Sequence, residues 1–233
     1  MKQAIKRDIY RAVGSAAGLL AEAGFRSRRQ GYWVCPKDDL RWELEVLFEP
    51  AYGDGVFRIG WAVRADIANR FVEFQVNDGV EHGTIGGDVG SLARGKSRMC
   101  LLAVTGAEPS LTARLLWGVR IQSVESLSAE LSHWFAHLLA FLQPIDSYPS
   151  LVDFLDSYHR SRRKPLFDLP DAASPMMAVL RGLSGDLDGG LRMLNDWVPP
   201  AKPGTDAYRS DLAYRDRVAK RLRPPEAGER YVR

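Results

Sequence analysis

The first residues of the chain place apolar side chains at the spacing of an amphipathic helix. In residues 2–23, Ile, Leu, Val and Ala recur every three or four positions, which places them on one helical face. Gly24 follows the last of these positions and is typical of the residue after a helix C-terminus. The pattern therefore predicts a helix over residues 2–23.

The pattern then changes to the two-residue period of β-strands. Apolar side chains occupy every second position in 40–48, and they do so again in 57–63 after the turn-forming stretch AYGDGV. This alternation predicts an antiparallel hairpin over 40–64 with one buried and one solvated face. We expect further strands in 31–36, 71–76 and 98–106, a loop over most of 78–91, and either a helix or a strand in 111–122.

The second half of the chain returns to helical spacing. Apolar stripes predict helices over 123–143 and 147–164, short helices within 174–183 and 190–198, and a basic helix over 206–223. We therefore expect an α+β fold, in which an antiparallel sheet of about four to six strands is backed by the N-terminal helix and a later helix pair. Three prolines in 165–175 suggest a boundary between an α+β domain, 1–165, and a helical C-terminal extension, 166–233.

Composition adds limits to this picture. The 233 residues are 45% hydrophobic and 26% charged, which is ordinary for a soluble domain with a sizeable core. Because apolar runs are short and the first residues are charged, we expect a cytoplasmic protein with no membrane segment and no secretory signal. Cys35 and Cys100 suit reduced, buried thiols. We expect no cofactor.

One short stretch matches a phosphate-binding motif. Gly90, Gly95, Lys96 and Ser97 have the spacing of a P-loop, which makes them candidate nucleotide-binding residues. A P-loop needs a buried strand before it and a long helix after it, and neither flank has that pattern. The alternative is a loop rich in Gly and Lys at the tip of a hairpin.

A second candidate lies on the helix over 123–143. Glu130, His133 and His137 have the Glu-x-x-His and His-x3-His spacings that place metal ligands on one helical face. They fall to the side and rear of the apolar stripe, and a further ligand is not identifiable. We therefore interpret them as a solvated polar face with no metal.

Catalytic chemistry finds little support in the sequence. There is no G-x-S-x-G nucleophile motif, and both cysteines lie in apolar strand patterns. Glu43 and Glu45 lie on one strand face, as paired catalytic carboxylates would, but Arg41 shares that face and favours a solvated salt-bridging surface. We predict that this surface and the basic tail helix contact a partner protein, with candidate residues Arg41, Glu43, Glu45, Arg215, Lys220 and Arg221.

Nucleic acid is an alternative partner. Two arginine clusters follow helices and have the charge to neutralise phosphates, and their members are Arg26, Arg28, Arg29, Arg160, Arg162 and Arg163. Acidic residues intersperse the tail helix, and no known nucleic-acid motif is present. The net charge of +3 is too small to choose a partner.

The order of these features resembles a bacterial family known only as a domain of unknown function. The resemblance rests on the helix ending in Gly24-Phe25, on RSRRQG leading into YWV, and on SLSAELSHWFAHLLAFLQPIDSYPSLVDFLD. It covers about residues 1–160 and implies a small α+β protein, some relatives looking like immunity or antitoxin-type binders in conflict systems. It carries over no catalytic residues.

We therefore predict a non-enzymatic protein-binding module, such as an immunity-type protein or an accessory subunit of a bacterial defence system. The alternatives are a nucleic-acid-associated subunit that uses the arginine clusters, and a nucleotide-binding enzyme that uses residues 90–97.

Overall fold

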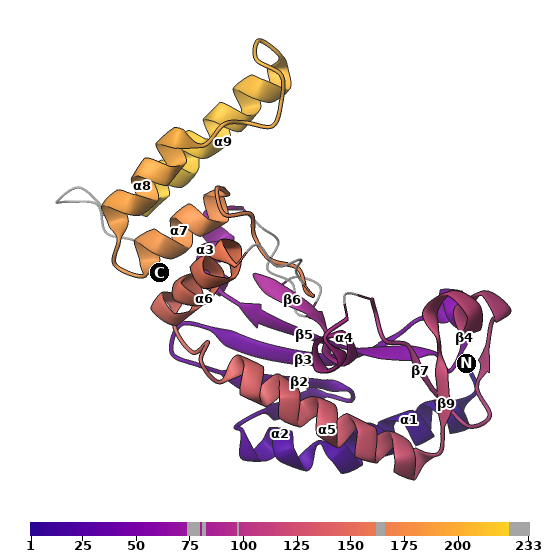
Figure 1. Cartoon of the computed structure of the whole chain (residues 1–233). Helices are drawn as coiled ribbons and strands as arrows, with labels where there is room; N and C mark the ends of the chain where they lie inside the picture. The colour runs from indigo at the N-terminus through magenta and orange to yellow at the C-terminus, as the bar shows by residue number, and fades with distance from the viewer. Residues whose placement is uncertain (74–79, 81–82, 97, 162–165, 224–233) are drawn as a thin grey trace. The chain divides into compact units, whose positions relative to one another are not determined.

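A computed structural model describes residues 1–73, 80, 83–96, 98–161 and 166–223 (Figure 1). The chain divides into two compact units, and each is described by itself. The first unit comprises Met1–Arg64, Asn77–Asp146 and Arg163–Leu169. The second comprises Ala65–Val76, Ser147–Arg162 and Pro170–Arg233. The predicted α+β class is confirmed.

The first unit is built on a mixed, mostly antiparallel sheet. Its described strands follow the order β1-β2-β3-β5-β7-β9, and β6 pairs with β5 beside β7. Among the described strands, only β7 and β9 run parallel to each other. The strands are β1 (Arg26–Arg29), β2 (Tyr32–Pro36), β3 (Arg41–Phe48), β5 (Phe57–Arg64), β6 (Ile85–Asp88), β7 (Leu102–Val104) and β9 (Arg120–Gln122). A separate pair joins β4 (Gly53–Asp54) to β8 (Glu108–Pro109).

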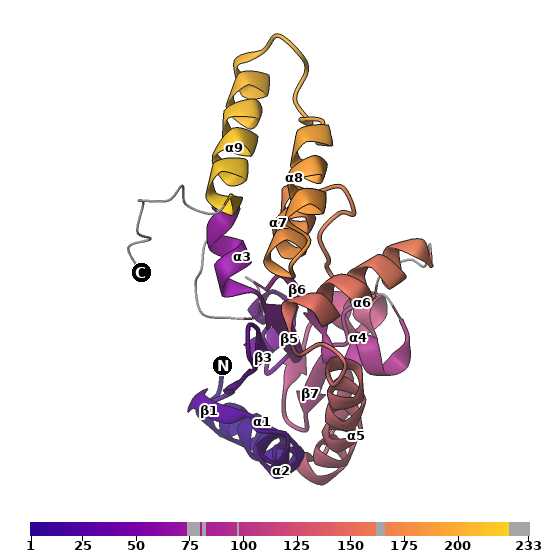
Figure 2. The same ribbon diagram turned by 90° about the vertical axis from the view of Figure 1, so that its left-hand side faces the viewer.

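Helices cover one side of this sheet. Figures 1 and 2 show α1 (Gln3–Ala16), α2 (Gly18–Glu22) and α5 (Val124–Leu142) together along the sheet. The predicted apolar stripes are the buried faces of α1 and α5. The Ser128 hydroxyl of α5 also donates a hydrogen bond to the Ala12 carbonyl of α1 at 3.1 Å. The two helices therefore form the layer that buries the inner face of the sheet.

The predicted N-terminal helix is interrupted once. α1 ends at Ala16 and α2 begins at Gly18, because the Ala17 N–H turns back to the Gly14 carbonyl at 3.2 Å. Two glycines, Gly14 and Gly18, flank this point and are weak helix formers, so a tighter turn costs little there. Gly24 ends α2 with a φ of +91°, as its position predicted.

The hairpin over 40–64 is confirmed. β3 and β5 pair from Arg41 opposite Arg64 to Phe48 opposite Phe57. β5 is buried on both faces along almost its whole length, so it lies at the centre of the unit.

The segment predicted as a loop holds regular structure. Residues 78–91 include β6 and the first turn of α4 (Val89–Arg94). A Cβ on Gly86 would lie 2.8 Å from the Trp61 carbonyl oxygen, and one on Gly87 would lie 2.9 Å from the Phe167 Cβ. The glycines therefore allow close packing of β6 against distant parts of the chain.

Two strand predictions were wrong or too long. The predicted strand over 71–76 begins at the last residue of α3 (Asp66–Phe71), and 74–76 lie outside the described residues. Within 98–106 only β7 is a strand. Residues 111–122 contain both of the elements left open, a π-helix (Ala113–Trp117) followed by β9.

The second unit is helical in its described part. It contains α3, α6 (Tyr148–Arg160), α7 (Pro175–Leu183), α8 (Leu187–Asp196) and α9 (Asp206–Leu222). A Cβ on Gly190 of α8 would lie 2.5 Å from the Ala178 carbonyl oxygen of α7, so the glycine permits a close helix crossing. α3 and α6, which the sequence placed in 1–165, cluster with these C-terminal helices. None of the described helices has the length and apolar character needed to cross a bilayer.

Candidate functional site

Residues 90–94 of the P-loop-like stretch belong to a helix and not to a phosphate-binding loop. β6 ends at Asp88, and α4 starts at the next residue. The Asp88 carboxylate accepts hydrogen bonds from the backbone N–H groups of Ser91 at 2.6 Å and Cys100 at 3.2 Å. Because this carboxylate caps the first turn of α4, the Ser91 N–H faces an acid of the chain itself and not an open phosphate site. The interpretation of 90–97 as a P-loop is therefore wrong in its geometry.

The motif residues have other roles. A Cβ on Gly90 would lie 2.5 Å from Trp134 Cη2 and 2.6 Å from Cys100 Cβ, so Gly90 permits close packing of α4. Gly95 ends α4 in the left-handed conformation at a φ of +64°. Lys96 is exposed, and Ser97 lies outside the described residues. The two glycines that match the motif thus permit close packing and end the helix.

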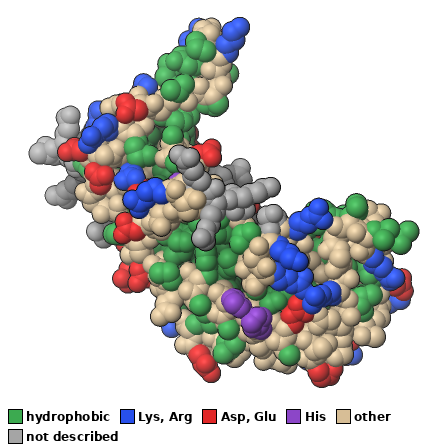
Figure 3. All heavy atoms as spheres, in the orientation of Figure 1, with side chains coloured by type: hydrophobic (Ala, Val, Ile, Leu, Met, Phe, Trp, Pro, Cys, Tyr) green, Lys and Arg blue, Asp and Glu red, His purple; other side chains and the backbone are tan. Residues whose placement is uncertain are grey.

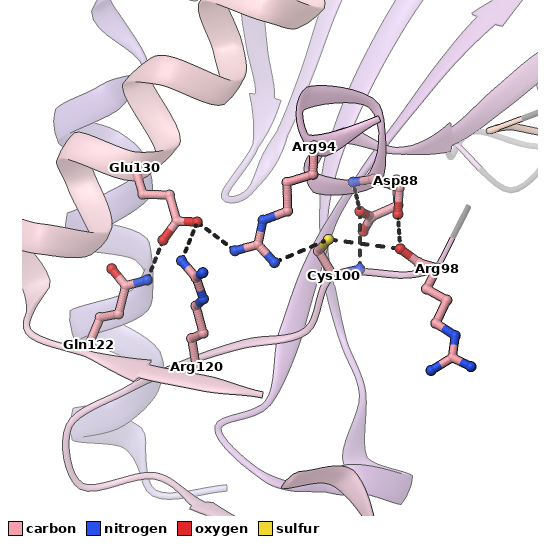
Figure 4. A network of polar contacts seen from close by, with 8 residues as sticks. Asp88, Arg94, Arg98, Cys100, Arg120, Gln122 and Glu130 are labelled. Atoms are coloured by element: carbon pink, nitrogen blue, oxygen red, sulfur yellow. Dashed lines mark hydrogen bonds and ion pairs between the residues drawn. The ribbon is translucent and has the colours of Figure 1, made fainter. Parts of the chain in front are cut away.

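The three metal candidates are not assembled as a ligand set. Glu130 accepts hydrogen bonds from Arg94 at 2.9 Å, from Arg120 at 3.5 Å and from Gln122 (Figure 4). His133 and His137 are exposed, with their ring centroids 4.5 Å apart. Across the described ranges, no group of three or more His, Cys, Asp and Glu side chains is placed to hold a metal ion.

The Glu130 network joins three elements of the first unit. Glu130 lies on α5, Arg94 on α4, and Arg120 on the edge strand β9 (Figure 4). The Arg94 guanidinium also lies 5.4 Å from the ring centroid of Trp134 and donates to Cys100 Sγ at 3.7 Å. The network therefore fixes a short edge strand and a short helix to the long helix α5.

The two cysteine thiols, of which Cys100 lies beside this network, are poor nucleophiles. Burial raises the pKa of the Asp88 carboxyl despite the hydrogen bonds that it accepts. Burial, and then the Asp88 charge, raise the pKa of the Cys100 thiol. Burial also raises the pKa of Cys35. Both thiols therefore stay protonated near neutral pH, as expected for structural cysteines.

The solvated face predicted on β3 is absent at its centre. Glu43 is fully buried, and its carboxylate pairs with Arg41 at 2.9 Å and with the fully buried Arg64 at 3.4 Å. Glu45 pairs with Arg29 at 2.7 Å. The prediction that Arg41, Glu43 and Glu45 form a wet contact surface is wrong for Glu43, because β3 lies between β2 and β5 and is covered there on both faces.

Most of the basic residues of the tail helix bind within their own unit. Arg221 donates to the Phe71 carbonyl at 3.2 Å and pairs with Glu73 at 3.0 Å, so it caps the C-terminal end of α3. Arg217 pairs with Glu73 at 3.1 Å, and this hydrogen bond lowers the pKa of Glu73. Arg215 pairs with Asp216 at 2.9 Å, whereas Lys220 is exposed. Arg215 and Arg221 are thus engaged, which leaves Lys220 for a partner.

The two arginine clusters have different environments. Arg26, Arg28 and Arg29 form β1, a fully exposed strand at the edge of the sheet. Arg160 donates to the Asp156 carbonyl one turn earlier at 3.2 Å, and Arg162 and Arg163 lie outside the described residues.

An exposed leucine surface was missed by the sequence analysis. Leu111, Leu115 and Leu116 are 72%, 74% and 62% exposed, and we call these three residues the leucine surface. Residues 111–112 form a helical turn that continues into the π-helix, so Leu115 and Leu116 lie about one turn after Leu111. Figure 3 shows hydrophobic side chains protruding at the right-hand end of the face drawn, beside Lys and Arg side chains. The signal present in LTARLLW was the spacing of the leucines, because a helical interpretation places Leu115 and Leu116 four and five positions after Leu111.

Comparison with known proteins returned no relative of this chain. No family model, no curated protein and no solved structure matches it. The resemblance to a bacterial domain of unknown function therefore stays a prediction.

Proposed function

We propose that the chain is a non-enzymatic protein-binding module and that the leucine surface is its contact site. The observation that carries the proposal is the exposure of three neighbouring leucines in one short helical segment. Exposed apolar residues scattered singly are ordinary, but grouped ones are typical of interaction sites.

The exposed area is large enough to matter for binding. Full burial of a leucine is worth about 1.5–3 kcal/mol, so burying the exposed fractions of these three would contribute about 3–6 kcal/mol. That is a useful share of the free energy of a specific complex, before the cost of association is subtracted.

The segment is held in place before any partner binds. Ala113 is fully buried, and the Trp117 ring lies 5.6 Å from the Tyr52 ring. The Ser110 N–H donates to the Tyr52 carbonyl at 2.9 Å, and the Ser110 hydroxyl accepts from the Ala113 N–H at 3.1 Å. A preorganised segment loses little conformational entropy on binding, which favours a role as a docking surface.

The charge beside the leucines suggests the chemistry of the partner. Arg114 is exposed between Ala113 and Leu115, and within the described part of the chain it has no acidic side chain within 4.0 Å. A partner that presents apolar side chains flanked by carboxylates would match this surface. An immunity-type or defence-system role rests on the family resemblance alone and stays a prediction.

The test is an affinity purification of the tagged full chain from its native host, with nuclease added and read by mass spectrometry. The variant Leu111→Ser with Leu115→Ser and Leu116→Ser removes the surface. A matched control replaces three exposed apolar residues elsewhere, Leu19, Ile67 and Val198, by serine.

We expect a stoichiometric protein partner with the wild type and the control, and its loss with the leucine variant. Sedimentation of the purified wild type and leucine variant distinguishes a second copy of the chain from a different partner. A partner that the leucine variant retains in full would contradict the assignment of the surface, and the absence of any protein partner would contradict the function.

A further inference from the structure

A basic depression lies on the N-terminal helix, within the first unit. It has a volume of about 430 Å³ and is lined by Gln3, Ala4, Lys6, Arg7, Tyr10 and Gln30. Five of these side chains come from α1, and Gln30 belongs to the turn that follows β1. Tyr10 holds the two parts together, because a Cβ on Gly31 would lie 2.6 Å from the Tyr10 ring. We call this feature the α1 depression.

The two cations of the α1 depression lack carboxylate partners. Within the described residues, neither Lys6 nor Arg7 has an acidic side chain within 4.0 Å, whereas Lys2 pairs with Glu108 at 2.9 Å. The Lys6 amine instead lies 5.3 Å from the centroid of the Phe48 ring. Stabilisation of the helix does not account for them, because the first turn of α1 contains no acidic residue and cations oppose the dipole at this end.

The basic surface continues along the edge strand. β1 ends one residue before Gln30, and all of its residues are exposed. At about 3.3 Å per residue, Arg28 and Arg26 lie about 7 and 13 Å from Gln30 along the chain. Across the described ranges, no acidic side chain lies within 4.0 Å of Arg26 or Arg28, while Arg29 is engaged by Glu45. The depression and the strand thus form a row of cations from two elements.

These side chains match the set that contacts nucleic-acid backbones. Phosphate oxygens in such complexes are bound by Arg and Lys and by Gln and Tyr side chains. Burial raises the pKa of Tyr10, so its hydroxyl stays protonated and can donate a hydrogen bond. A lipid surface would favour large apolar side chains around the cations, and the lining of the depression contains only Ala4 and the Tyr10 ring.

We propose that the α1 depression and strand β1 together bind the phosphate backbone of a nucleic acid, without reading its sequence. The proposal is independent of the protein-binding function, since it uses different residues. Binding would rest on neutralising phosphates, so it would weaken steeply as the salt concentration rises.

The experiment measures the fluorescence anisotropy of a labelled oligothymidylate and of a labelled duplex, titrated with the full chain at several salt concentrations. The test variant is Lys6→Gln with Arg7→Gln, and a second variant is Arg26→Gln with Arg28→Gln. The matched control is Arg192→Gln with Lys202→Gln, which removes the same charge from exposed positions of the second unit. Thermal unfolding followed by circular dichroism checks that each variant folds.

We expect the wild type to bind at about 50 mM salt, and each test variant to bind about tenfold more weakly with a salt slope smaller by about 1.4 to 1.8. The control and the leucine-surface variant should bind as the wild type does. The proposal is overturned by an absence of oligonucleotide binding at about 50 mM salt. It is also overturned by an equal loss in the control, or by binding to phosphatidylglycerol vesicles without binding to either nucleic acid.

Discussion

The substitution Glu43→Gln tests the buried ion cluster at the centre of the sheet. The wild-type carboxylate faces Arg64 at 3.4 Å and Arg41 at 2.9 Å, and both Glu43 and Arg64 are fully buried. The amide keeps the shape of the side chain but removes the carboxylate charge that pairs with Arg64. Removing one partner of a buried pair costs about 3–5 kcal/mol.

The matched control is Glu45→Gln, two residues along the same strand. Glu45 is 15% exposed and pairs with Arg29, whose side chain is 59% exposed, so solvent screens this pair and its contribution lies closer to the 0–1 kcal/mol typical of surface pairs, about 1 kcal/mol. Urea unfolding followed by tryptophan fluorescence and circular dichroism compares the two variants with the wild type. We expect Glu43→Gln to lower the unfolding free energy by several times as much as Glu45→Gln. In thermal unfolding its Tm should fall by about 6–20 °C.

Equal, small effects of the two substitutions would refute this reasoning. Glu43 would then behave as a solvated residue, as the sequence pattern alone predicted, and the burial of the cluster would have no energetic consequence. A loss of soluble protein for Glu43→Gln alone is consistent with the expected destabilisation, and the refolding yield from urea would measure it.

Two further predictions concern the segment around α4. Gly90→Ala should lower the unfolding free energy by about 1–3 kcal/mol, because the added methyl overlaps Trp134. A wild-type urea midpoint for this variant would show that α4 does not pack as described. Because burial and the Asp88 charge raise the pKa of Cys100, thiolate labelling of native Cys100 should begin only at a pH above the range of an ordinary thiol. Asp88→Asn removes the charge and should shift this pH profile downward, and an unshifted profile would argue against the Asp88 effect.

The candidate site was harder to predict than the fold, and Glu43 shows why. Alternation along β3 correctly indicated which residues share a face. The alternation contained no information on what covers the face with Glu43, because the burial of that face depends on segments far away in the chain. The P-loop motif gave a wrong prediction for a related reason. The conformation around Gly90 depends on contacts with Asp88, Trp134 and Cys100, which the motif does not contain.

The leucine surface and the α1 depression depend on tertiary structure to different degrees. The three leucines are close in sequence, so a helical interpretation of 111–117 would have placed them on one side. Their exposure was not predictable, because an apolar stripe is more often buried than exposed. The α1 depression joins Lys6 to Gln30, which are brought together by tertiary packing that includes Tyr10 against Gly31.

Local periodicity alone determined the α+β class, the hairpin of β3 and β5, and the positions of α5, α6 and α9. These features follow from side-chain spacing within a few turns or strand residues, which is a property of the sequence itself. The tertiary structure decided which faces are exposed to solvent and which arginines have acidic partners. It also decided that positions 86 and 90 have no room for a side chain. Each of these depends on contacts between residues far apart in the chain, where the free energy of burial and pairing overrides the local pattern.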